Sequence, residues 1–593
     1  MFHTAGCGVA SVARVLALWL LLAPAAWAGR LEIPLRVPLE AVQRSLAAQL
    51  PASPNAIYRE GPCRFLNLDA PTLAAAEGEL RLSTPGSGAL GAELFGRCQN
   101  AADWQGTMHV RLVPRIDENG KLRLRIVDSR LDDSRGRKGV PLLWRLARNQ
   151  VHPRLEGFSY DLGASRNTLL SVLRGIAPGL ENLQLLTPRV EATQIVVPLA
   201  LDLPDAWLAS AAAGATAPST PGAPLTEAEL EALDRALQPW DAFLAYVIKQ
   251  VARDNENPEL RQRLFTLLLD SRYRLSAILA GEEAPAGDPV RALFIEAWGE
   301  LRTILADARY TLFIDAGDAL LALDRAAPGL GVTISADGLR QLARSLAPGA
   351  SGDPLARDFG VDPEMGRLFE VEEPPKSADV PVENSWLDFF IRSAHAQGRS
   401  LDRWIPTRDE LAAYEPRVHE LLRKAAAAEL ERAPLAAPYD AMYRSMVPTT
   451  ALIESCWRQY VMRAGKASYL RSQSGSIGIM QINQVVWRGF YDVQRLRWDT
   501  AYNARAGAQI LMRYMKDYAV PYASKSGEPS HAPRATYAVY NAGPRAVGRF
   551  AKNPPHPREQ RVDEHLWKLY QGIAAGGQAD LRTCGVSSVT AAQ

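Results

Sequence analysis

The chain has 593 residues, and at roughly 100–200 residues per domain this length predicts about three or four structural units. Hydrophobic residues make up 47 % of the sequence and charged residues 22 %, values close to those of soluble globular proteins, which excludes a largely disordered chain and a polytopic membrane protein. Lys and Arg number 67 against 65 Asp and Glu, a formal net charge of +2, without a long block of one sign. The sequence therefore predicts no nucleic-acid partner.

The first 28 residues have the pattern of a secretory signal peptide. An apolar run, Val15–Leu22, follows Arg14, and the segment ends in the small-x-small pattern Ala26-Trp27-Ala28. A membrane anchor is the alternative, but a spanning helix needs about 20 apolar residues and Pro24 interrupts this run. We therefore predict that residues 1–28 are cleaved near Ala28 and that the protein is exported.

Four cysteines remain once the signal peptide is removed: Cys63, Cys98, Cys456 and Cys584. An even number of cysteines in an exported protein predicts disulfides, and three pairings are open. The pairing that keeps both bonds local is Cys63–Cys98 with Cys456–Cys584, and we favour it. The sequence contains no CxxC or HExxH pattern, and its histidines have no metal-ligand spacing, so we expect no metal site.

Residues 29–210 are strand-rich. Polar and apolar residues alternate over residues 31–37, 108–113 and 121–127, and the last two segments predict a hairpin around the turn Asp117–Gly120. A helix is expected over residues 39–50. These elements predict an α+β domain, whose role the sequence does not state.

A glycine pattern occurs within this domain. Gly86, Gly88 and Gly91 match G-x-G-x-x-G, but neither the parallel βαβ pattern nor the later acidic residue of a nucleotide-binding unit is evident, and we interpret the segment as a loop. The strand–helix–strand opening of the domain and its long amphipathic strands resemble lipid-binding tubular domains of the bacterial envelope. That resemblance implies an envelope protein or a lipid as a partner of the N-terminal domain.

The composition changes twice further along the chain. Residues 211–225 are rich in Ala, Pro, Gly, Ser and Thr, which is typical of a linker. Residues 226–370 show apolar positions at three- and four-residue steps, which predicts an all-α region with Phe294 and Trp298 in its core. Residues 371–400 begin with an acidic, proline-containing stretch and are expected to form a second linker before a C-terminal domain at 401–585.

The segment 445–463 predicts an amphipathic helix that carries one carboxyl group. Ser445 is a candidate N-cap and Pro448 suits the first helical turn. Glu454 lies on the flank of the apolar face, beside Trp457, where partial desolvation would raise its pKa and keep it protonated. A lone helical Glu is more often a solvated surface residue, so the neighbouring motifs decide between the two interpretations.

Two further motifs follow Glu454. The first, Ser472–Asn483, is a Gly- and Ser-rich loop that runs into an apolar stretch, and the second is Tyr540-Asn541-Ala542-Gly543. With Glu454-Ser455, and in this order, they resemble the catalytic domain of lytic transglycosylases of the soluble-lytic-transglycosylase type, a lysozyme-like fold. The pattern Asn-x-x-x-Gly at 503–507 agrees with that resemblance, which covers roughly residues 435–575.

The resemblance implies a role for each motif. Glu454 would be the catalytic residue, and the residues that bind or surround the glycan would be Ser472, Gly478, Met480, Gln481, Tyr540 and Asn541. Met480 has an alternative interpretation as a core residue, and Gly478 and Asn541 as turn residues. Two departures from the family pattern occur: the segment between Glu454 and Ser472 is longer than usual, and Asn483 replaces a hydrophobic residue.

The implied reaction is cleavage of the β-1,4 bond between N-acetylmuramic acid and N-acetylglucosamine in peptidoglycan, with formation of 1,6-anhydro ends and no cofactor. A hydrolase on the same fold needs a second carboxylate, and the sequence has no Asp or Glu between Ser455 and Tyr491, although Asp492 or Asp499 could fold back. The alternatives are therefore a lysozyme-type muramidase and a non-catalytic glycan-binding envelope scaffold. A wall substrate and a cleaved signal peptide together imply the periplasm.

The predicted architecture is multidomain. It comprises an α+β N-terminal domain, an all-α middle region, and a lysozyme-like, mainly α C-terminal catalytic domain.

Overall fold

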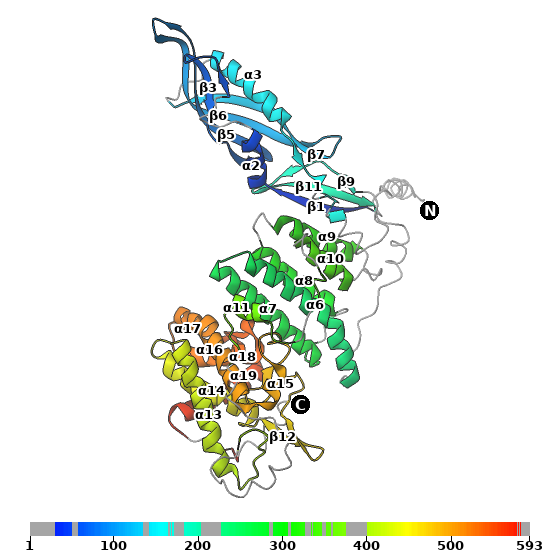
Figure 1. The fold of residues 1–593 in the computed structure, drawn as a ribbon, viewed down its shortest axis with the longest axis vertical. Helices are drawn as coiled ribbons and strands as arrows, with labels where there is room; N and C mark the ends of the chain where they lie inside the picture. The colour runs from blue at the N-terminus through cyan, green and yellow to red at the C-terminus, as the bar shows by residue number, and fades with distance from the viewer. Residues whose placement is uncertain are drawn as a thin grey trace, which may run out of the picture. The chain divides into compact units, whose positions relative to one another are not determined.

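The computed structural model divides the chain into two compact units (Figure 1). The N-terminal unit comprises Met1–Ala217 and Leu305–Ala350, and the C-terminal unit comprises Pro218–Ile304 and Ser351–Gln593. The structure describes residues 30–49, 57–134, 141–163, 166–167, 169–170, 183–202, 227–283, 289–305, 310–326, 334, 336–346, 352–356, 360–374, 400–554, 556–577, 579 and 581–582. The predicted signal peptide, the linker at 211–225 and residues 375–399 of the second linker lie outside these residues.

Two antiparallel sheets form the N-terminal unit. The larger has the strand order β2-β3-β5-β6-β7-β8, with β4 beside β5, and the smaller joins β1, β9 and β10 to β11. The strands of the larger sheet are β2 (Tyr58–Arg59), β3 (Arg64–Leu68), β4 (Thr72–Ala76), β5 (Glu79–Leu94), β6 (Arg97–Ile116), β7 (Lys121–Asp133) and β8 (Tyr160–Asp161). Those of the smaller sheet are β1 (Arg30–Pro38), β9 (Leu183–Leu185), β10 (Arg189–Val190) and β11 (Gln194–Asp202).

The hairpin expected over 108–127 is confirmed as β6 and β7. Asp117 holds its turn, because one carboxylate oxygen accepts from the backbone N–H groups of Asn119 and Lys121, while Gly120 supplies a positive φ of 73°. The helix expected over 39–50 is confirmed as α2 (Leu39–Gln49). The segment therefore has the α+β character that its alternation predicts.

The interpretation of the G-x-G-x-x-G segment as a loop is wrong, because Gly86, Gly88 and Gly91 lie inside β5. A Cβ on Gly86 would come within 2.5 Å of the Asn67 carbonyl oxygen in β3. A Cβ on Gly91 would come within 2.4 Å of the Gln99 carbonyl oxygen in β6. These glycines thus allow close approach of neighbouring strands, and at Gly91 the register of β5 and β6 also shifts.

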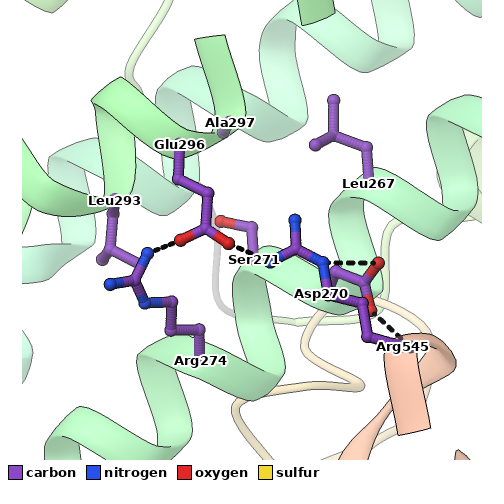
Figure 2. A pocket seen from close by; sticks show the side chains of 8 residues that line it. All are labelled: Leu267, Asp270, Ser271, Arg274, Leu293, Glu296, Ala297 and Arg545. Atoms are coloured by element: carbon purple, nitrogen blue, oxygen red, sulfur yellow. Dashed lines mark hydrogen bonds and ion pairs between the residues drawn. The ribbon is translucent and has the colours of Figure 1, made fainter. Parts of the chain in front are cut away.

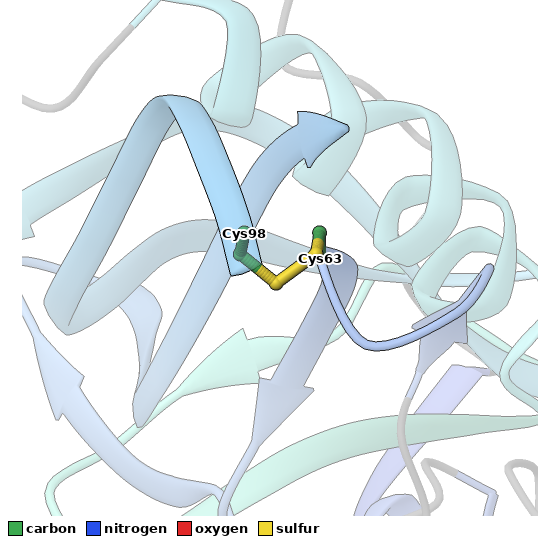
Figure 3. Close-up of a disulfide and its surroundings, with 2 residues drawn as sticks. All are labelled: Cys63 and Cys98. Atoms are coloured by element: carbon green, nitrogen blue, oxygen red, sulfur yellow. A yellow bond between two sulfur atoms is a disulfide. The ribbon is translucent and has the colours of Figure 1, made fainter. Parts of the chain in front are cut away.

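A disulfide joins Cys63, just before β3, to Cys98 in β6, with a Cα–Cα distance of 5.3 Å (Figure 3). This is the local pairing that the sequence favours, and it crosslinks two strands that flank β5. Of the second predicted pair, Cys456 is buried and Cys584 lies outside the described residues.

Helices cover both sheets of the N-terminal unit. Helix α3 (Pro141–Gly157) buries Leu143, Ala147, Val151 and Leu155, one side chain per turn, against β5, β6 and β7. Helix α9 (Thr311–Ala326) packs on β1, where Arg36 donates to the buried Asp315 carboxylate at 2.7 Å. Helix α10 (Ala336–Leu346) packs on α9.

The helices of the predicted middle region, residues 226–370, are divided between the two units. Helices α9 and α10 belong to the N-terminal unit. The others belong to the C-terminal unit and are α6 (Glu227–Arg253), α7 (Pro258–Leu279), α8 (Pro289–Ile304) and α11 (Pro363–Leu368). Phe294 and Trp298 of α8 are buried, stacked on one another and beside Trp240 and Phe243 of α6, which confirms their expected place in a core.

The rest of the C-terminal unit is mainly helical, with two short hairpins. Its helices are α13 (Leu411–Arg432), α14 (Tyr439–Ser455), α15 (Val493–Trp498), α16 (Thr500–Tyr514), a π-helical turn η2 (Met515–Ala519), α17 (Val520–Ser526), α18 (His531–Ala542), the short η3 (Pro544–Ala546) and η4 (Arg549–Ala551), and α19 (Pro557–Ala574). Its strands are β12 (Tyr460–Arg463), β13 (Lys466–Tyr469), β14 (Ser476–Ile477) and β15 (Ile482–Asn483).

Candidate functional site

Helix α14 places Glu454 in its last turn. The sequence expectation of a helix over 445–463 is wrong at both ends, because α14 begins at Tyr439 and ends at Ser455. The chain turns at Cys456 and Trp457, whose φ angles of 53° and 57° are left-handed. Pro448 therefore lies inside the helix, and the Trp457 indole returns to donate to the Pro448 carbonyl at 2.9 Å.

Glu454 is half-buried and has a polar partner. The Tyr537 hydroxyl donates to Glu454 Oε1 at 2.9 Å. Burial raises the pKa of Glu454 to about 7, against the opposing effects of the Tyr537 hydrogen bond and the Arg549 charge. The C-terminal turn of a helix also disfavours a negative charge. Glu454 can therefore hold a proton near neutral pH and release it, as a general acid and base requires.

Ser455 connects the end of α14 to the glycine-rich loop. Its hydroxyl donates to the Ile479 carbonyl at 2.6 Å and accepts from the Arg458 backbone N–H at 3.2 Å. The Glu-Ser pair thus has two functions in the structure. The first residue supplies the carboxyl group and the second fixes its helix against the loop.

The loop itself is held by two buried amide side chains. Gln459 accepts from the Ile479 N–H at 2.7 Å, and Asn503 accepts from the Met480 N–H at 2.9 Å. Both side chains also donate to the Leu496 carbonyl, which ties the loop to α15. Buried amides with several partners rigidify the backbone that they bind.

Two glycines are required by this packing. Gly478 has a φ of 77°, and a Cβ there would lie 2.4 Å from both Asn503 Nδ2 and Gln459 Oε1. Gly507 lies one turn after Asn503 on α16, and a Cβ there would lie 2.4 Å from the Met480 side chain. The Asn-x-x-x-Gly pattern is therefore one face of a helix that receives the loop.

Helix α18 completes the cluster with two tyrosines one turn apart. Tyr537 reaches Glu454, and the Tyr540 hydroxyl donates to the Met480 carbonyl at 2.5 Å. One helix face therefore holds both the carboxyl group and the loop beside it. Arg549, in η4, donates to the exposed Asn541 Oδ1 at 2.7 Å, and burial lowers the pKa of its guanidinium.

The remaining predicted residues have mainly structural contacts. The Ser472 hydroxyl accepts from the Ser476 N–H at 3.0 Å and closes the turn of the loop. Met480 is fully buried against Gly507, so its side chain is part of the core. Gln481, also buried, donates to the Gly478 carbonyl at 2.8 Å. Their assignment to glycan binding stays a prediction.

Three residues of this cluster were not singled out from the sequence: Gln459, Tyr537 and Arg549. Tyr537 could have been found, because it lies three positions before Tyr540 and helical neighbours at that spacing share a face. The sequence offers no signal for Gln459 or Arg549, since each reaches its partners only after the chain has turned back.

The part of the chain that the structure describes shows no group of three or more His, Cys, Asp or Glu side chains that could hold a metal ion. Its helices also include none with the length and hydropathy that a membrane crossing needs.

The comparisons with known proteins identify one family. Residues 441–562 match the family model of the transglycosylase SLT domain. Neither the curated proteins nor the solved structures that were compared with the chain give a match. The matched range contains Glu454, the glycine-rich loop and Tyr540, so the family predicted from these motifs is confirmed for this part of the chain. Residues 441–562 of this protein are therefore a transglycosylase SLT domain.

Proposed function

We propose that this protein is a peptidoglycan lytic transglycosylase that cleaves the β-1,4 bond between N-acetylmuramic acid and N-acetylglucosamine, with Glu454 as its acid and base. The observation that carries the proposal is the half-buried carboxyl group of Glu454, with a pKa raised to about 7 and a hydrogen bond from Tyr537, inside an SLT domain. This domain family supports a transglycosylase enzyme that acts on peptidoglycan.

The Glu454 carboxyl group acts twice in the proposed reaction, first as an acid and then as a base. Glu454 gives its proton to the glycosidic oxygen as the bond from that oxygen to C1 breaks, and the N-acetyl group of the same sugar assists. The C6 hydroxyl oxygen then bonds to C1 and displaces the assisting N-acetyl oxygen, and the proton of that hydroxyl passes to the Glu454 carboxylate. No water is consumed, and the product ends are 1,6-anhydro sugars. A carboxyl group with a pKa near 7 suits both steps, because neither protonation state is strongly disfavoured at neutral pH.

The structure offers little support for a hydrolase with two carboxylates. Among the described residues, no carboxyl group contributes to the shift of the Glu454 pKa. The two carboxyl groups named as candidates from the sequence have other roles, since Asp492 caps α15 and Asp499 caps α16 by accepting from backbone N–H groups. To serve as the second carboxylate of a lysozyme-type muramidase, either of them would have to leave its helix cap.

Mass spectrometry of the products tests the proposal. Residues 29–593 are incubated with purified sacculi, beside Glu454→Gln and a control, Glu431→Gln, which changes an exposed carboxylate on α13. We expect muropeptides lighter than hydrolytic products by one water, a loss of about 10²–10⁴-fold with E454Q, and no loss with E431Q. Reducing ends would instead show a muramidase, and no release by the unaltered chain would favour a glycan-binding scaffold.

We also propose that the protein is exported to the periplasm, where this substrate lies. The support is the pattern of residues 1–28 and the disulfide between Cys63 and Cys98, a bond that forms in oxidising compartments. Fractionation of cells followed by N-terminal sequencing should find a periplasmic protein that begins near Gly29. A cytoplasmic chain that keeps Met1 would contradict this proposal.

A further inference from the structure

Helix α7 lies outside the residues that match the SLT family, yet it contacts the end of α18 directly. The Tyr273 hydroxyl on α7 donates to the Tyr540 carbonyl at 2.9 Å. Burial raises the pKa of Tyr273, so its hydroxyl keeps the proton that it donates. Since a hydroxyl has one proton, Tyr514 is the donor in the 3.0 Å contact between the Tyr514 and Tyr273 hydroxyls.

The Tyr540 carbonyl belongs to the last turn of α18. The final carbonyls of an α-helix have no partner within the helix and need one from elsewhere. Tyr273 supplies that partner from a different segment of the chain, more than 250 residues earlier. It therefore fixes the end of the helix that carries both Tyr537, the partner of Glu454, and Tyr540, the clamp on the glycine-rich loop.

The Tyr273 ring also explains the last residue of the Tyr-Asn-Ala-Gly motif. Gly543 has a φ of 87°, and a Cβ there would lie 2.8 Å from Tyr273 Cδ2. Only glycine fits both conditions. The backbone that follows α18 thus packs closely against α7.

A group of ion pairs also joins the chain just after Gly543 to helices α7 and α8. Arg545, in η3, contacts Asp270 of α7 and Glu296 of α8 (Figure 2). It also contacts a second carboxylate of α8, Glu300. Its backbone N–H also lies 3.3 Å from Asp270 Oδ1. Asp270 precedes Tyr273 by three positions, so both residues lie on one side of α7. Two independent contacts therefore join this side of the helix to the chain on either side of Gly543.

We propose that Tyr273, on a helix that lies outside the SLT domain, is a positioning residue of the active site. This inference rests on the proposed function, in which Glu454 is the acid and base. Tyr273 acts through α18, since its hydroxyl holds the helix that brings Tyr537 to the carboxyl group. Its loss should slow the chemical step and leave glycan binding unchanged.

The test compares two hydroxyl deletions on α7. Tyr273→Phe removes the bond to Tyr540 and keeps the ring. The matched control, Thr266→Val, removes a bond of similar length, 2.8 Å, from α7 to the Tyr518 hydroxyl. Residues 29–593 and both variants are assayed on soluble glycan strands. We expect kcat to fall about three- to tenfold with Y273F, with KM within twofold, and both constants within twofold for T266V.

Equal losses in the two variants, a change in KM alone, or no loss with Y273F would overturn the proposal. A second readout does not depend on turnover: the pKa of Glu454, followed by carboxyl ¹³C NMR with E454Q to assign its signal. Tyr537 and Arg549 both lower this pKa, so a displaced α18 should raise it in Y273F and not in T266V. An unaltered chain that releases no product would refute the proposed function, whereas an unchanged pKa would refute the role of Tyr273.

Discussion

The two units of the molecule bury different kinds of side chain. In the N-terminal unit, the described buried polar residues are Thr84, Asp315 and Ser345. In the C-terminal unit, they are Asp241, Ser271, Arg272, Ser276, Glu429, Thr449, Thr450, Ser455, Gln459, Gln481, Thr500, Asn503, Thr536, Arg549 and Asp563. The described part of the first unit therefore buries few polar side chains, whereas that of the second buries many.

The two units differ in their buried polar side chains because a sheet and a site with a shifted pKa have different structural needs. A sheet needs only register and a covered apolar face, which alternation provides. A carboxyl group with a shifted pKa needs partners fixed to within a fraction of an ångström, and buried polar networks provide that rigidity because leaving any member unpaired is costly. Buried polar density therefore marks the unit in which we propose the chemistry.

The largest expected effect comes from breaking a buried ion pair of the C-terminal unit. Arg272 on α7 donates to Asp241 on α6 at 2.7 Å and to the Arg488 carbonyl at 2.8 Å. Arg272→Met leaves the Asp241 carboxylate buried without the charge and the hydrogen bond of Arg272. We therefore expect a loss of about 3–5 kcal/mol in the free energy of unfolding. The control is Arg423→Met, which removes an exposed pair with Glu420 and should cost less than about 1 kcal/mol. Chemical denaturation measures both, and similar losses would contradict the comparison.

A smaller effect is expected from the disulfide of the N-terminal unit. Replacing Cys63 and Cys98 together by Ala frees a loop with a sequence separation of 35 residues, which should cost about 2–4 kcal/mol. The loss should appear in the unfolding of the N-terminal unit, while the activity per folded molecule stays unchanged. Glycan cleavage measured beside circular dichroism separates the two, and a fall in kcat would show that the units are coupled.

The smallest effect concerns the stability cost of Glu454 itself. Its pKa rises from 4.5 to about 7 on folding, so the folded state holds an extra proton between these values and stability falls as the pH rises through that range. Gln cannot ionise. We therefore expect Glu454→Gln to raise the Tm of the C-terminal unit by about 2–4 °C near pH 8 and to leave it unchanged near pH 4. Glu431→Gln should show no such pH dependence, and an equal Tm for E454Q at both pH values would contradict the shift.

The sequence motifs predict the residues of the site, but not the residues elsewhere in the chain that hold them in position. Glu454, the loop and Tyr540 could be placed together because the family pattern fixes their order and spacing. Tyr273 could not, because its partner lies more than 250 residues away and one helical tyrosine among many carries no signal. The division of the middle helices between the two units could not be predicted for the same reason. Helix α9 joins the first unit through the pair of Asp315 and Arg36, which are far apart in the sequence and which helical periodicity cannot reveal.

Local rules succeeded where the local sequence decides the structure. The turn at Asp117–Gly120 and helix α2 follow from residues within a few positions of each other. The same rules failed at Gly86, where close strands and not a turn require glycine, and at Pro448, which α14 tolerates inside a helix because tertiary packing stabilises it.

The most direct test of the central claim is the pH dependence of kcat/KM for glycan cleavage. A Glu454 held protonated by burial predicts that kcat/KM falls as the pH rises through about 7. Tyr537→Phe removes a hydrogen bond that lowers the pKa of Glu454, so the fall in kcat/KM should move to higher pH in this variant. The control is Tyr443→Phe, which deletes a buried hydroxyl that donates to the Ala508 carbonyl and should leave the midpoint in place. A kcat/KM that stays constant through neutral pH, or a midpoint that Y537F does not move, would contradict the account.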